Sequence, residues 1–345
     1  MRKMGVFVML DYSLLERLCK ADAPSGFEDE VREIVISEIK NYADNITVDN
    51  MGNVLVFKKG KEIPKKKLLL SAHMDEVGFI VTDIKSDGTL KFAEVGGIND
   101  TAVFAKQVKV GKNKISGVVN AKPTHLLNAD ERKKVPSKDS LCIDIGAKDR
   151  EEAEKYVSLG DMIVFDSPYE NKNGRVISKA IDDRFGCLVL IEMIKSELPY
   201  DMYFSFVVQE EIGLRGAKAA AYTINPDCAI VIEATTAADV PFAEGEKRVC
   251  LVGGGAVVSF MDRSTMYDRE FYNIARSADT KTQTKTMIAG GNDAGAIHCS
   301  RSGVRTIAVS VPCRYIHSSS SLASVEDMES VFEVVKYTAE KILSE

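Results

Sequence analysis

The chain has 345 residues, of which 45% are hydrophobic and 28% are charged, and its formal net charge is −6. This composition is typical of an ordinary globular protein with room for two domains or for one large domain with an insertion. The acidic balance argues against a general nucleic-acid binder, and no apolar run approaches the ~20 residues of a membrane helix, so neither nucleic acid nor a membrane is an expected partner.

The first ten residues imitate a signal peptide, but their apolar core is short and Asp11 ends it without a small-residue cleavage site. We interpret this segment as an extended start, with Met9 as an alternative initiator to Met1. The seven cysteines are odd in number, no two lie close in sequence, and several occur in apolar runs. This distribution favours reduced thiols in a cytoplasmic protein over a disulfide scaffold.

The predicted elements begin with two helices in residues 11–42, where apolar residues recur at helical spacing around a break at residues 24–26. Short apolar strands are predicted at residues 67–71, 202–208, 228–232 and 306–310. Helices are predicted at residues 185–196, 217–222 and 325–343. Because apolar strands that alternate with helices are typical of sheets covered on both sides, we predict an α/β domain with a mixed sheet and helices on both faces.

Residues 77–165 break this theme, because they contain short alternating stretches separated by glycine-containing turns. The stretches are residues 79–81, 102–104, 107–110 and 115–119. We predict that this segment is a small β-rich domain inserted into the α/β domain, which is then formed by residues 1–76 and 166–345.

The pair Glu210 and Glu211, which follows a strongly apolar strand, is the most informative feature of the chain. Two adjacent acidic side chains are costly to hold at such a position unless a cation faces them. Other segments offer residues of the types that bind metals, namely His73, Asp75, Asp182, Asp183, Glu233 and His317. Two histidines and several carboxylates from five segments indicate a hydrolytic site with two metal ions, in which one glutamate binds metal and its neighbour moves protons.

Each of these segments taken alone has a simpler interpretation. The two histidines could lie in exposed loops, the glutamates could be solvated at strand ends, and the aspartate pair could cap the following helix. The joint pattern favours a site, because Asp75 could accept the second ring N–H of a ligating histidine and Asp182 could bridge two cations with its two oxygens. His125 is predicted to be structural or at a contact between subunits, and His298 to pack in the core or support the site.

These residues lie in motifs that resemble the M42 family of metallo-aminopeptidases, which includes glutamyl and deblocking aminopeptidases and members labelled as endoglucanases. The resemblance covers nearly the whole chain, and the motifs are specific in combination. The motifs are Ala23-Pro24-Ser25-Gly26 with Glu28, Ser71-Ala72-His73-Met74-Asp75-Glu76-Val77-Gly78, Ala180-Ile181-Asp182-Asp183-Arg184 with Gly186, Gln209-Glu210-Glu211 with Gly213 and Arg215-Gly216-Ala217, Gly290-Gly291-Asn292-Asp293-Ala294-Gly295, and Arg314-Tyr315-Ile316-His317-Ser318.

The resemblance implies a peptidase domain interrupted by a β-rich domain that mediates assembly into homo-oligomers, often dodecamers. It implies two divalent ions per subunit, Zn²⁺ or Co²⁺, with the metal ligands His73, Asp182, Glu211, Glu233 and His317. Asp182 would bridge the two ions. Glu210 would be the general base, and Asp75 would orient His73. The chain departs from the family in having Glu233 where aspartate is frequent and Ser319 where proline is frequent.

The predicted function is therefore the hydrolysis of the N-terminal residue of peptides, with Glu210 moving the proton of the attacking water. One alternative is a glycoside hydrolase that uses Glu210 and a second carboxylate, although it leaves His73 and His317 without a role. The other is a non-catalytic binding or assembly protein of the same fold. The preferred N-terminal residue stays open, and we expect the pocket to be formed near residues 251–255 and Asp239.

Overall fold

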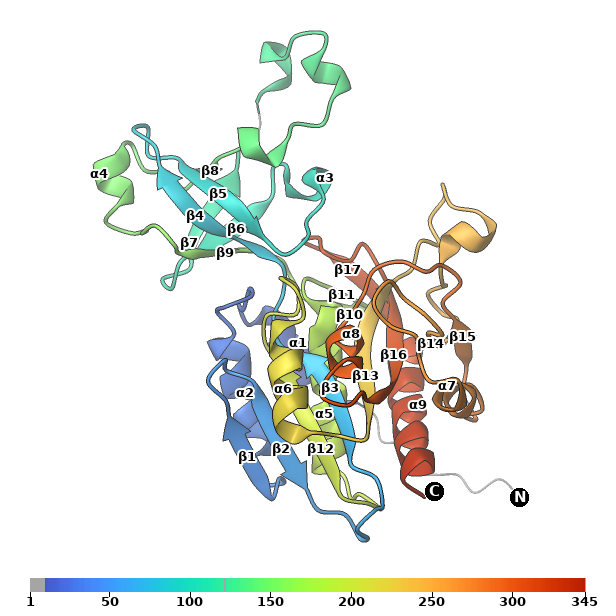
Figure 1. Ribbon diagram of the computed structural model, residues 1–345. Helices are drawn as coiled ribbons and strands as arrows, with labels where there is room; N and C mark the ends of the chain where they lie inside the picture. The colour runs from blue at the N-terminus through green and yellow to red at the C-terminus, as the bar shows by residue number, and fades with distance from the viewer. Residues whose placement is uncertain (1–9, 121, 345) are drawn as a thin grey trace.

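The computed structural model describes residues 10–120 and 122–344, so Met1 and Met9, the two candidate starts of the protein, lie outside the described residues. The chain folds into a large mixed sheet with helices and a separate small antiparallel barrel, which stands above the sheet in the view of Figure 1. This architecture confirms the predicted α/β class with a β-rich insertion.

The large sheet has eleven strands in the described part of the chain. They are β1 (Asn45–Val48), β2 (Val54–Lys58), β3 (Leu68–His73), β10 (Glu170–Lys172), β11 (Arg175–Ser178), β12 (Met202–Val207), β13 (Cys228–Thr236), β14 (Ala256–Val258), β15 (Thr282–Thr284), β16 (Arg305–Arg314) and β17 (Ser321–Ser324). Four neighbouring strands are parallel, in the order β12, β3, β13 and β16, and antiparallel strands extend them on both sides. All six residues of β3 are buried, as expected for a strand covered on both faces.

Helices cover both faces of this sheet. They are α1 (Tyr12–Lys20), α2 (Asp29–Ile39), α5 (Ile181–Lys195), α6 (Arg215–Ile224), α7 (Arg269–Arg276), α8 (Ala294–His298) and α9 (Val325–Ser344), with a 3₁₀ turn η4 (Gly245–Arg248). The apolar helix α5 packs against β3 and β13, with α1 and α2 beside it, while α6 and α8 lie on the opposite face (Figure 1). The side chain of Asp11 starts α1 by accepting hydrogen bonds from two backbone N–H groups of the first turn.

The barrel is a separate unit with its own hydrophobic core. Its strands are β4 (Gly78–Ile84), β5 (Leu90–Val95), β6 (Gln107–Val110), β7 (Ile115–Val119), β8 (Ile143–Asp144) and β9 (Met162–Phe165), and it also contains α3 (Asp100–Val103), α4 (Arg150–Ala153), η1 (Thr124–Leu126), η2 (Glu131–Lys133) and η3 (Lys138–Ser140). Phe79 fills the core, and its ring packs edge-on against Phe92 and Phe165 with centroids 5.0 and 5.5 Å apart.

The prediction of an extended stretch at residues 102–104 of the barrel is wrong. Residues 102–104 were expected to be extended, whereas the chain forms the short helix α3 there. The side chain of Asn99 accepts a hydrogen bond from the Thr101 N–H and caps this turn, and Val103 turns into the barrel core. A cap followed by one buried residue therefore outweighs the short apolar alternation.

All seven cysteines are free, and six of them are buried, while Cys299 is exposed. This state agrees with the expected reduced thiols. Within residues 10–120 and 122–344, no helix combines the length and the apolar character that crossing a membrane would require.

Candidate metal centre

The parallel strands bring the predicted site residues to one edge of the sheet. Because β3, β12, β13 and β16 run in the same direction, their carboxyl ends meet at this edge, which is where open α/β sheets place their ligands. His73 is the last residue of β3, and Glu210 and Glu211 follow β12. His317 lies in the loop between β16 and β17.

Glu233 lies inside β13 and not beyond the end of a strand, which corrects the predicted strand 228–232. β13 continues to Thr236 because β16 pairs with it along its whole length, with Glu233 opposite Ser310. The strand pairing fixes the backbone of Glu233, whose side chain is buried with Oε2 3.8 Å from Nε2 of His73.

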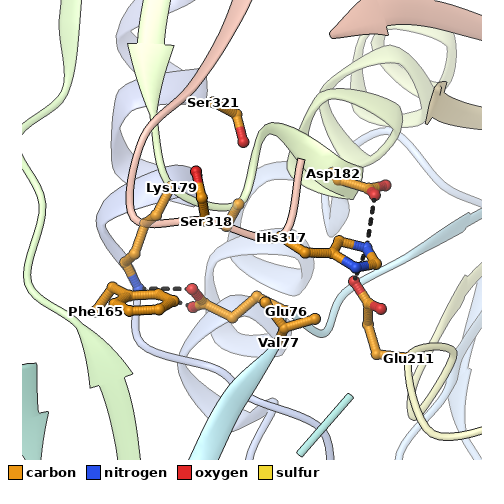
Figure 2. A pocket seen from close by; sticks show the side chains of 10 residues that line it. Glu76, Val77, Phe165, Lys179, Asp182, Glu211, His317, Ser318 and Ser321 are labelled. Atoms are coloured by element: carbon orange, nitrogen blue, oxygen red, sulfur yellow. Dashed lines mark hydrogen bonds and ion pairs between the residues drawn. The ribbon is translucent and has the colours of Figure 1, made fainter. Parts of the chain in front are cut away.

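Asp182 lies between the two histidines. Its Oδ1 is 3.4 Å from Nε2 of His73, and its Oδ2 is 3.4 Å from Nε2 of His317. Nε2 of His317 is also 3.2 Å from Oε1 of Glu211, and Figure 2 shows the His317 ring between these two carboxylates. Asp182 thus presents one oxygen to each histidine, which is the arrangement that a carboxylate needs to bridge two cations.

Two groups of three side chains offer ligand atoms that lie within 4.8 Å of one another. One group is His73, Asp182 and Glu211, and the other is His73, Asp183 and Glu233. Asp183 was noted as a residue of a metal-binding type but was not assigned as a ligand. Its oxygens accept hydrogen bonds from the backbone N–H groups of Gly186 at 2.9 Å and His73 at 3.4 Å. These contacts give Asp183 a role in fixing the start of α5 against the end of β3.

The buried oxygens of this centre are short of partners. Glu233 Oε1 has no hydrogen-bond partner among the described residues, and Asp182 Oδ1 has only the long 3.4 Å contact with the His73 ring. A buried carboxylate oxygen without a partner is costly, and buried carboxylates that outnumber the available cations commonly bind metal ions. Imidazole and carboxylate ligands suit Zn²⁺ and similar divalent ions, so the residues present fit a divalent metal centre.

Asp75 links the first histidine to the glutamate pair. Its Oδ1 accepts a hydrogen bond from the N–H of Glu210 at 3.0 Å, and its Oδ2 accepts one from the N–H of Glu211 at 3.1 Å. The Ser25 hydroxyl donates to the same Oδ2 at 2.5 Å. Nδ1 of His73 lies 3.4 Å from Asp75 Oδ1 and 3.1 Å from the Asp75 carbonyl oxygen. One fully buried side chain therefore holds the imidazole and the two glutamates in a fixed relation.

The pKa values of Glu210 and His317 are both raised, but for different reasons. Burial raises the pKa of Glu210 well above its ordinary range. Burial opposes the charge of His317, but hydrogen bonds to Asp182 and Glu211 raise the pKa of this histidine to about 11. Without a metal, His317 therefore keeps its proton at neutral pH, and a metal ion must displace that proton in order to bind.

The sequence did not reveal two groups near the centre. Asp293 is fully buried, neither of its oxygens has a hydrogen-bond partner in the described chain, and burial raises its pKa to about 7. Asp293 lies in the motif of residues 290–295, but that motif gave no indication of a role for its side chain. The second group is the Gly97 carbonyl oxygen, 2.8 Å from Nδ1 of His317, and a backbone oxygen leaves no signature in a sequence.

The remaining histidines do not line the cavity beside the centre. His298 is half-buried, and its Nδ1 lies 3.0 Å from the Val304 carbonyl oxygen, so it supports the turn between α8 and β16. His125 is exposed in η1 of the barrel.

A cavity of about 510 Å³ opens beside the centre. The predicted site residues on its wall are His73, Asp182, Glu210, Glu211, Glu233 and His317. The cations Arg263 and Lys285 also line it. The expectation for Asp239 is wrong, because both its oxygens bind the guanidinium group of Arg314, at 2.6 and 2.8 Å. Residues 251–255 do not line the cavity either, and Asp327 binds two of their backbone N–H groups.

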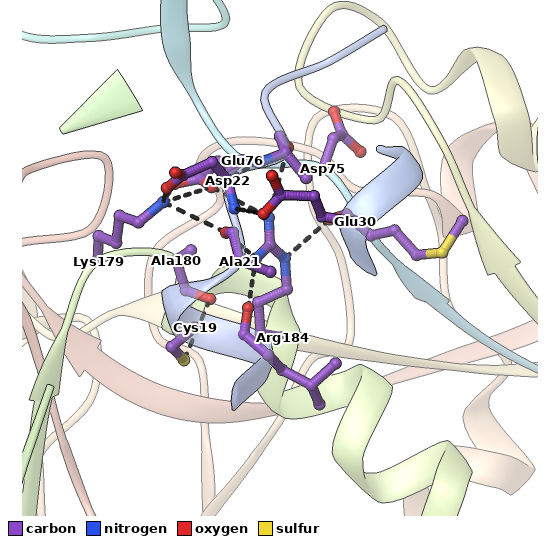
Figure 3. A network of polar contacts seen from close by, with 12 residues as sticks. Cys19, Ala21, Asp22, Glu30, Asp75, Glu76, Lys179, Ala180 and Arg184 are labelled. Atoms are coloured by element: carbon purple, nitrogen blue, oxygen red, sulfur yellow. Dashed lines mark hydrogen bonds and ion pairs between the residues drawn. The ribbon is translucent and has the colours of Figure 1, made fainter. Parts of the chain in front are cut away.

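A buried network of ion pairs supports the centre on the side of the barrel (Figure 3). Nζ of Lys179 lies 2.8 Å from Oε1 of Glu76 and 3.0 Å from Oδ1 of Asp22. Arg184 is fully buried, and its guanidinium group lies 3.1 Å from the same oxygen of Glu76. Because Glu76 follows His73 by three residues, the network fixes the segment through which β3 passes into the barrel.

Comparisons with known proteins agree with this picture. A family model described as M42 glutamyl aminopeptidase matches residues 52–334. A protein of Acetivibrio thermocellus named as an aminopeptidase is 38% identical over 330 residues, which cover 94% of this chain and 97% of that protein. The TET aminopeptidase of a Thaumarchaeota archaeon has a TM-score of 0.89 at 38% identity, and the match covers 94% of both chains. The TET1 peptidase of Pyrococcus horikoshii, which can assemble into a tetrahedron or a large octahedral shell, has a TM-score of 0.84 at 33% identity over 95% of this chain and 98% of that one.

The fold and its relatives define a peptidase, an enzyme that hydrolyses peptide bonds. Within that class, the chain belongs to the M42 family of aminopeptidases. Membership implies a divalent metal, and the side chains gathered around Asp182 are of the types that would bind it.

We predict that Lys179→Met destabilises the protein by about 3 kcal/mol, the lower end of the cost of breaking a buried ion pair. The substitution removes the cation that faces Oε2 of Glu76 and Oδ1 of Asp22, while Arg184 still pairs with Glu76 and Lys114 with Asp22. The free energy of unfolding in urea would measure this loss. Lys172→Met is the matched control, because Lys172 is exposed and pairs weakly with Glu170 at 3.6 Å. An equal and small effect of both substitutions would show that the network contributes little to stability.

Proposed function

We propose that the protein is a dinuclear metal-dependent aminopeptidase that removes the N-terminal residue of peptides. The observation that carries this proposal is the position of Asp182, with one oxygen toward His73 and the other toward His317. A single ion would need only one of these contacts. Glu211 lies beside His317 and Glu233 beside His73, so each histidine has a carboxylate of its own in addition to the shared one.

The metal ligands in this proposal are His73, Asp182, Glu211, Glu233 and His317, and the ions are Zn²⁺ or Co²⁺. When bound, such ions supply a polarised carbonyl group and a hydroxide nucleophile at neutral pH. Asp75 has no ligand role, since its oxygens are occupied by the contacts that orient His73 and the glutamate pair.

Glu210 is the general base of the proposed reaction. It lines the cavity, and its backbone is fixed by Asp75, but none of its side-chain oxygens is committed to an ion pair in the described residues. Its carboxylate would accept the proton of the attacking water and return it to the leaving amine. The raised pKa of Glu210 suits a group that must both take up and release a proton.

Peptides with a free N-terminus are the proposed substrates, and self-association into a homo-oligomer is the proposed state. The assemblies of the P. horikoshii TET1 peptidase support self-association. A cytoplasmic location stays a prediction, which the free cysteines support.

We further infer that the cavity favours an acidic side chain at the N-terminal residue of the substrate. Nζ of Lys285 donates to the Ala289 carbonyl oxygen at 3.0 Å, and no carboxylate among the described residues forms an ion pair with Lys285 or Arg263. The nearby Asp262 is already occupied by Tyr267 and by backbone N–H groups. Two cations without counter-ions beside a peptidase centre would bind a substrate carboxylate.

The metal-stripped protein should cleave no aminoacyl-p-nitroanilide, and added Zn²⁺ or Co²⁺ should restore cleavage of unblocked substrates only. The reason is that the nucleophile depends on the metal, and that the free α-amine of an unblocked substrate would bind beside the metal or a site carboxylate, which a blocked amine could not do. Hydrolysis of blocked substrates at equal rates, or no hydrolysis by folded and metal-loaded protein, would contradict an aminopeptidase. Hydrolysis of β-glucan in that second case would favour the glycosidase alternative.

Glu210→Gln should lower kcat by about 10²–10⁴-fold, the usual contribution of a general base, while metal binding stays intact. Metal content and kcat of the purified variant would test this. Glu197→Gln is the matched control, because Glu197 is exposed and forms a surface ion pair with Lys61. Retention of full activity by Glu210→Gln would rule out the assigned base.

Lys285→Gln should lower kcat/KM for a glutamyl substrate by about 10–100-fold relative to a leucyl substrate, because a charge-assisted hydrogen bond contributes about 1.5–3 kcal/mol. Arg263→Gln should act in the same direction. Lys281→Gln, four residues before Lys285 on the exposed surface and paired with Glu326, should leave the ratio unchanged. A wild-type protein that prefers leucyl over glutamyl substrates would contradict the inferred preference.

A further inference from the structure

The inserted barrel reaches into the proposed metal centre through a backbone oxygen. The Gly97 carbonyl oxygen lies 2.8 Å from Nδ1 of His317, although the two residues are 220 positions apart. Gly97 belongs to the barrel, in the segment between β5 and α3, whereas His317 belongs to the large sheet. The cavity wall also includes Gly97, so the barrel contributes to the site itself.

This contact determines which ring nitrogen of His317 can bind a metal. A carbonyl oxygen only accepts hydrogen bonds, so Nδ1 must be the ring nitrogen that carries the proton. In the neutral imidazole Nε2 is then unprotonated, and Nε2 is the atom that faces Asp182 and Glu211. Ligating histidines commonly need such a partner on their second nitrogen, and His73 finds one in its own strand region, at Asp75.

The segment around Gly97 is tightly held. Gly96 has a φ of +82°, and a Cβ at this position would lie 2.8 Å from Cγ1 of Val77 and 3.2 Å from Cβ of Glu211, so only glycine fits. Ile98 is buried in the barrel core. The Gly97 carbonyl is therefore fixed by a neighbour on each side.

Lys138 fastens the same segment from outside. It lies in η3, within the excursion between β7 and β8 that projects from the barrel (Figure 1). Its ammonium group donates to the Ile98 carbonyl oxygen at 2.8 Å and forms ion pairs with Glu94 and with Asp100, the latter at 3.4 Å. Lys138 thus joins both ends of the stretch that carries Gly97.

We propose that the barrel completes the metal centre, with the Gly97 carbonyl as the group that orients His317 and Lys138 as the positioning residue that holds this carbonyl in place. The proposal rests on the proposed metallo-aminopeptidase function. It adds that the metal position ligated by His317 depends on the barrel. The site formed by the large sheet alone would contain His317 without the partner that sets its tautomer.

Separate contacts attach the barrel to α2 and to the segment between α1 and α2, so a change at Lys138 does not release the barrel. Lys114 lies 2.8 Å from Oε1 of Glu30 and 3.0 Å from Oδ2 of Asp22, and Lys109 lies 3.6 Å from the same oxygen of Asp22. These ion pairs involve β6 and the β6–β7 turn, away from η3. A substitution of Lys138 therefore acts on the Gly97 segment and not on the docking of the barrel as a whole.

The test compares Zn²⁺ binding by the full-length protein and by Lys138→Met, through competition with a chromophoric chelator. We expect the weaker of two Zn²⁺ sites to lose about tenfold in affinity, the lower end of the effect of removing an outer-shell partner. Peptidase activity should be low at limiting Zn²⁺ and should recover at excess Zn²⁺ with KM unchanged, which a merely misfolded variant would not do.

Lys122→Met is the matched control, because Lys122 lies in the same excursion and pairs with Glu131 at 2.8 Å, without touching residues 94–100. Glu94→Gln removes the partner of Lys138 from the other side, and it should lower Zn²⁺ affinity in the same direction. The double variant Lys138→Met with Glu94→Gln should lose less than the product of the two single effects, because both substitutions break one contact.

Wild-type Zn²⁺ affinity in Lys138→Met would overturn the proposal, and so would an equal loss in Lys122→Met. A wild-type protein that binds no metal would overturn the proposed function, and this inference with it. A wild-type protein that binds two ions and cleaves peptides, with Lys138→Met indistinguishable from it, would overturn this inference alone.

Discussion

The structure depends on the confinement of several carboxylates in a buried space at the carboxyl edge of four parallel strands. Burial disfavours their charge, as the raised pKa values of Glu210 and Glu211 indicate, and carboxylates this close repel one another. Two imidazoles offset part of this repulsion, and Asp75 fixes the backbone around the glutamate pair. The carboxylates still outnumber the imidazoles, and Oε1 of Glu233 has no partner in the described chain, so this edge suits divalent cations.

Much of this arrangement could be predicted from the sequence because parallel strands obey a simple rule. Each of the segments that end near His73, Glu210 and His317 is a short apolar run of the length and composition that favour a buried strand. If such strands are parallel, the residues at their carboxyl ends must be neighbours in space, whatever the distance between them in sequence. The inserted unit was visible for a related reason, since the pattern changes from continuous apolar runs to alternation after Val77 and returns near residue 166.

The features that could not be predicted depend on partners that a sequence does not display. β13 extends through Glu233 because β16 is long enough to pair with it, and no property of residues 233–236 indicates that length. Asp239 was expected in the pocket but is bound by Arg314, 75 residues away. The helix at residues 100–103 depends on a cap from Asn99. In each case the deciding contact is made by a residue that looks unremarkable in its own segment.

The two histidines of the centre differ in whether their Nδ1 partner comes from the large sheet or from the inserted barrel. Nδ1 of His73 lies 3.1 Å from the carbonyl oxygen of Asp75, so its partner is present wherever β3 and the following turn are folded. Nδ1 of His317 has its partner at Gly97, which belongs to a separate hydrophobic unit. A small displacement of the barrel would leave the Nδ1 contact of His73 unchanged and would remove the Nδ1 partner of His317, whose Nε2 would keep its contacts with Asp182 and Glu211. Asp182 contacts both histidines, so its position is linked both to the large sheet, through His73, and to the barrel, through His317. On the proposed function, one metal position therefore requires only the large sheet, whereas the other requires that the barrel is folded and correctly placed upon it.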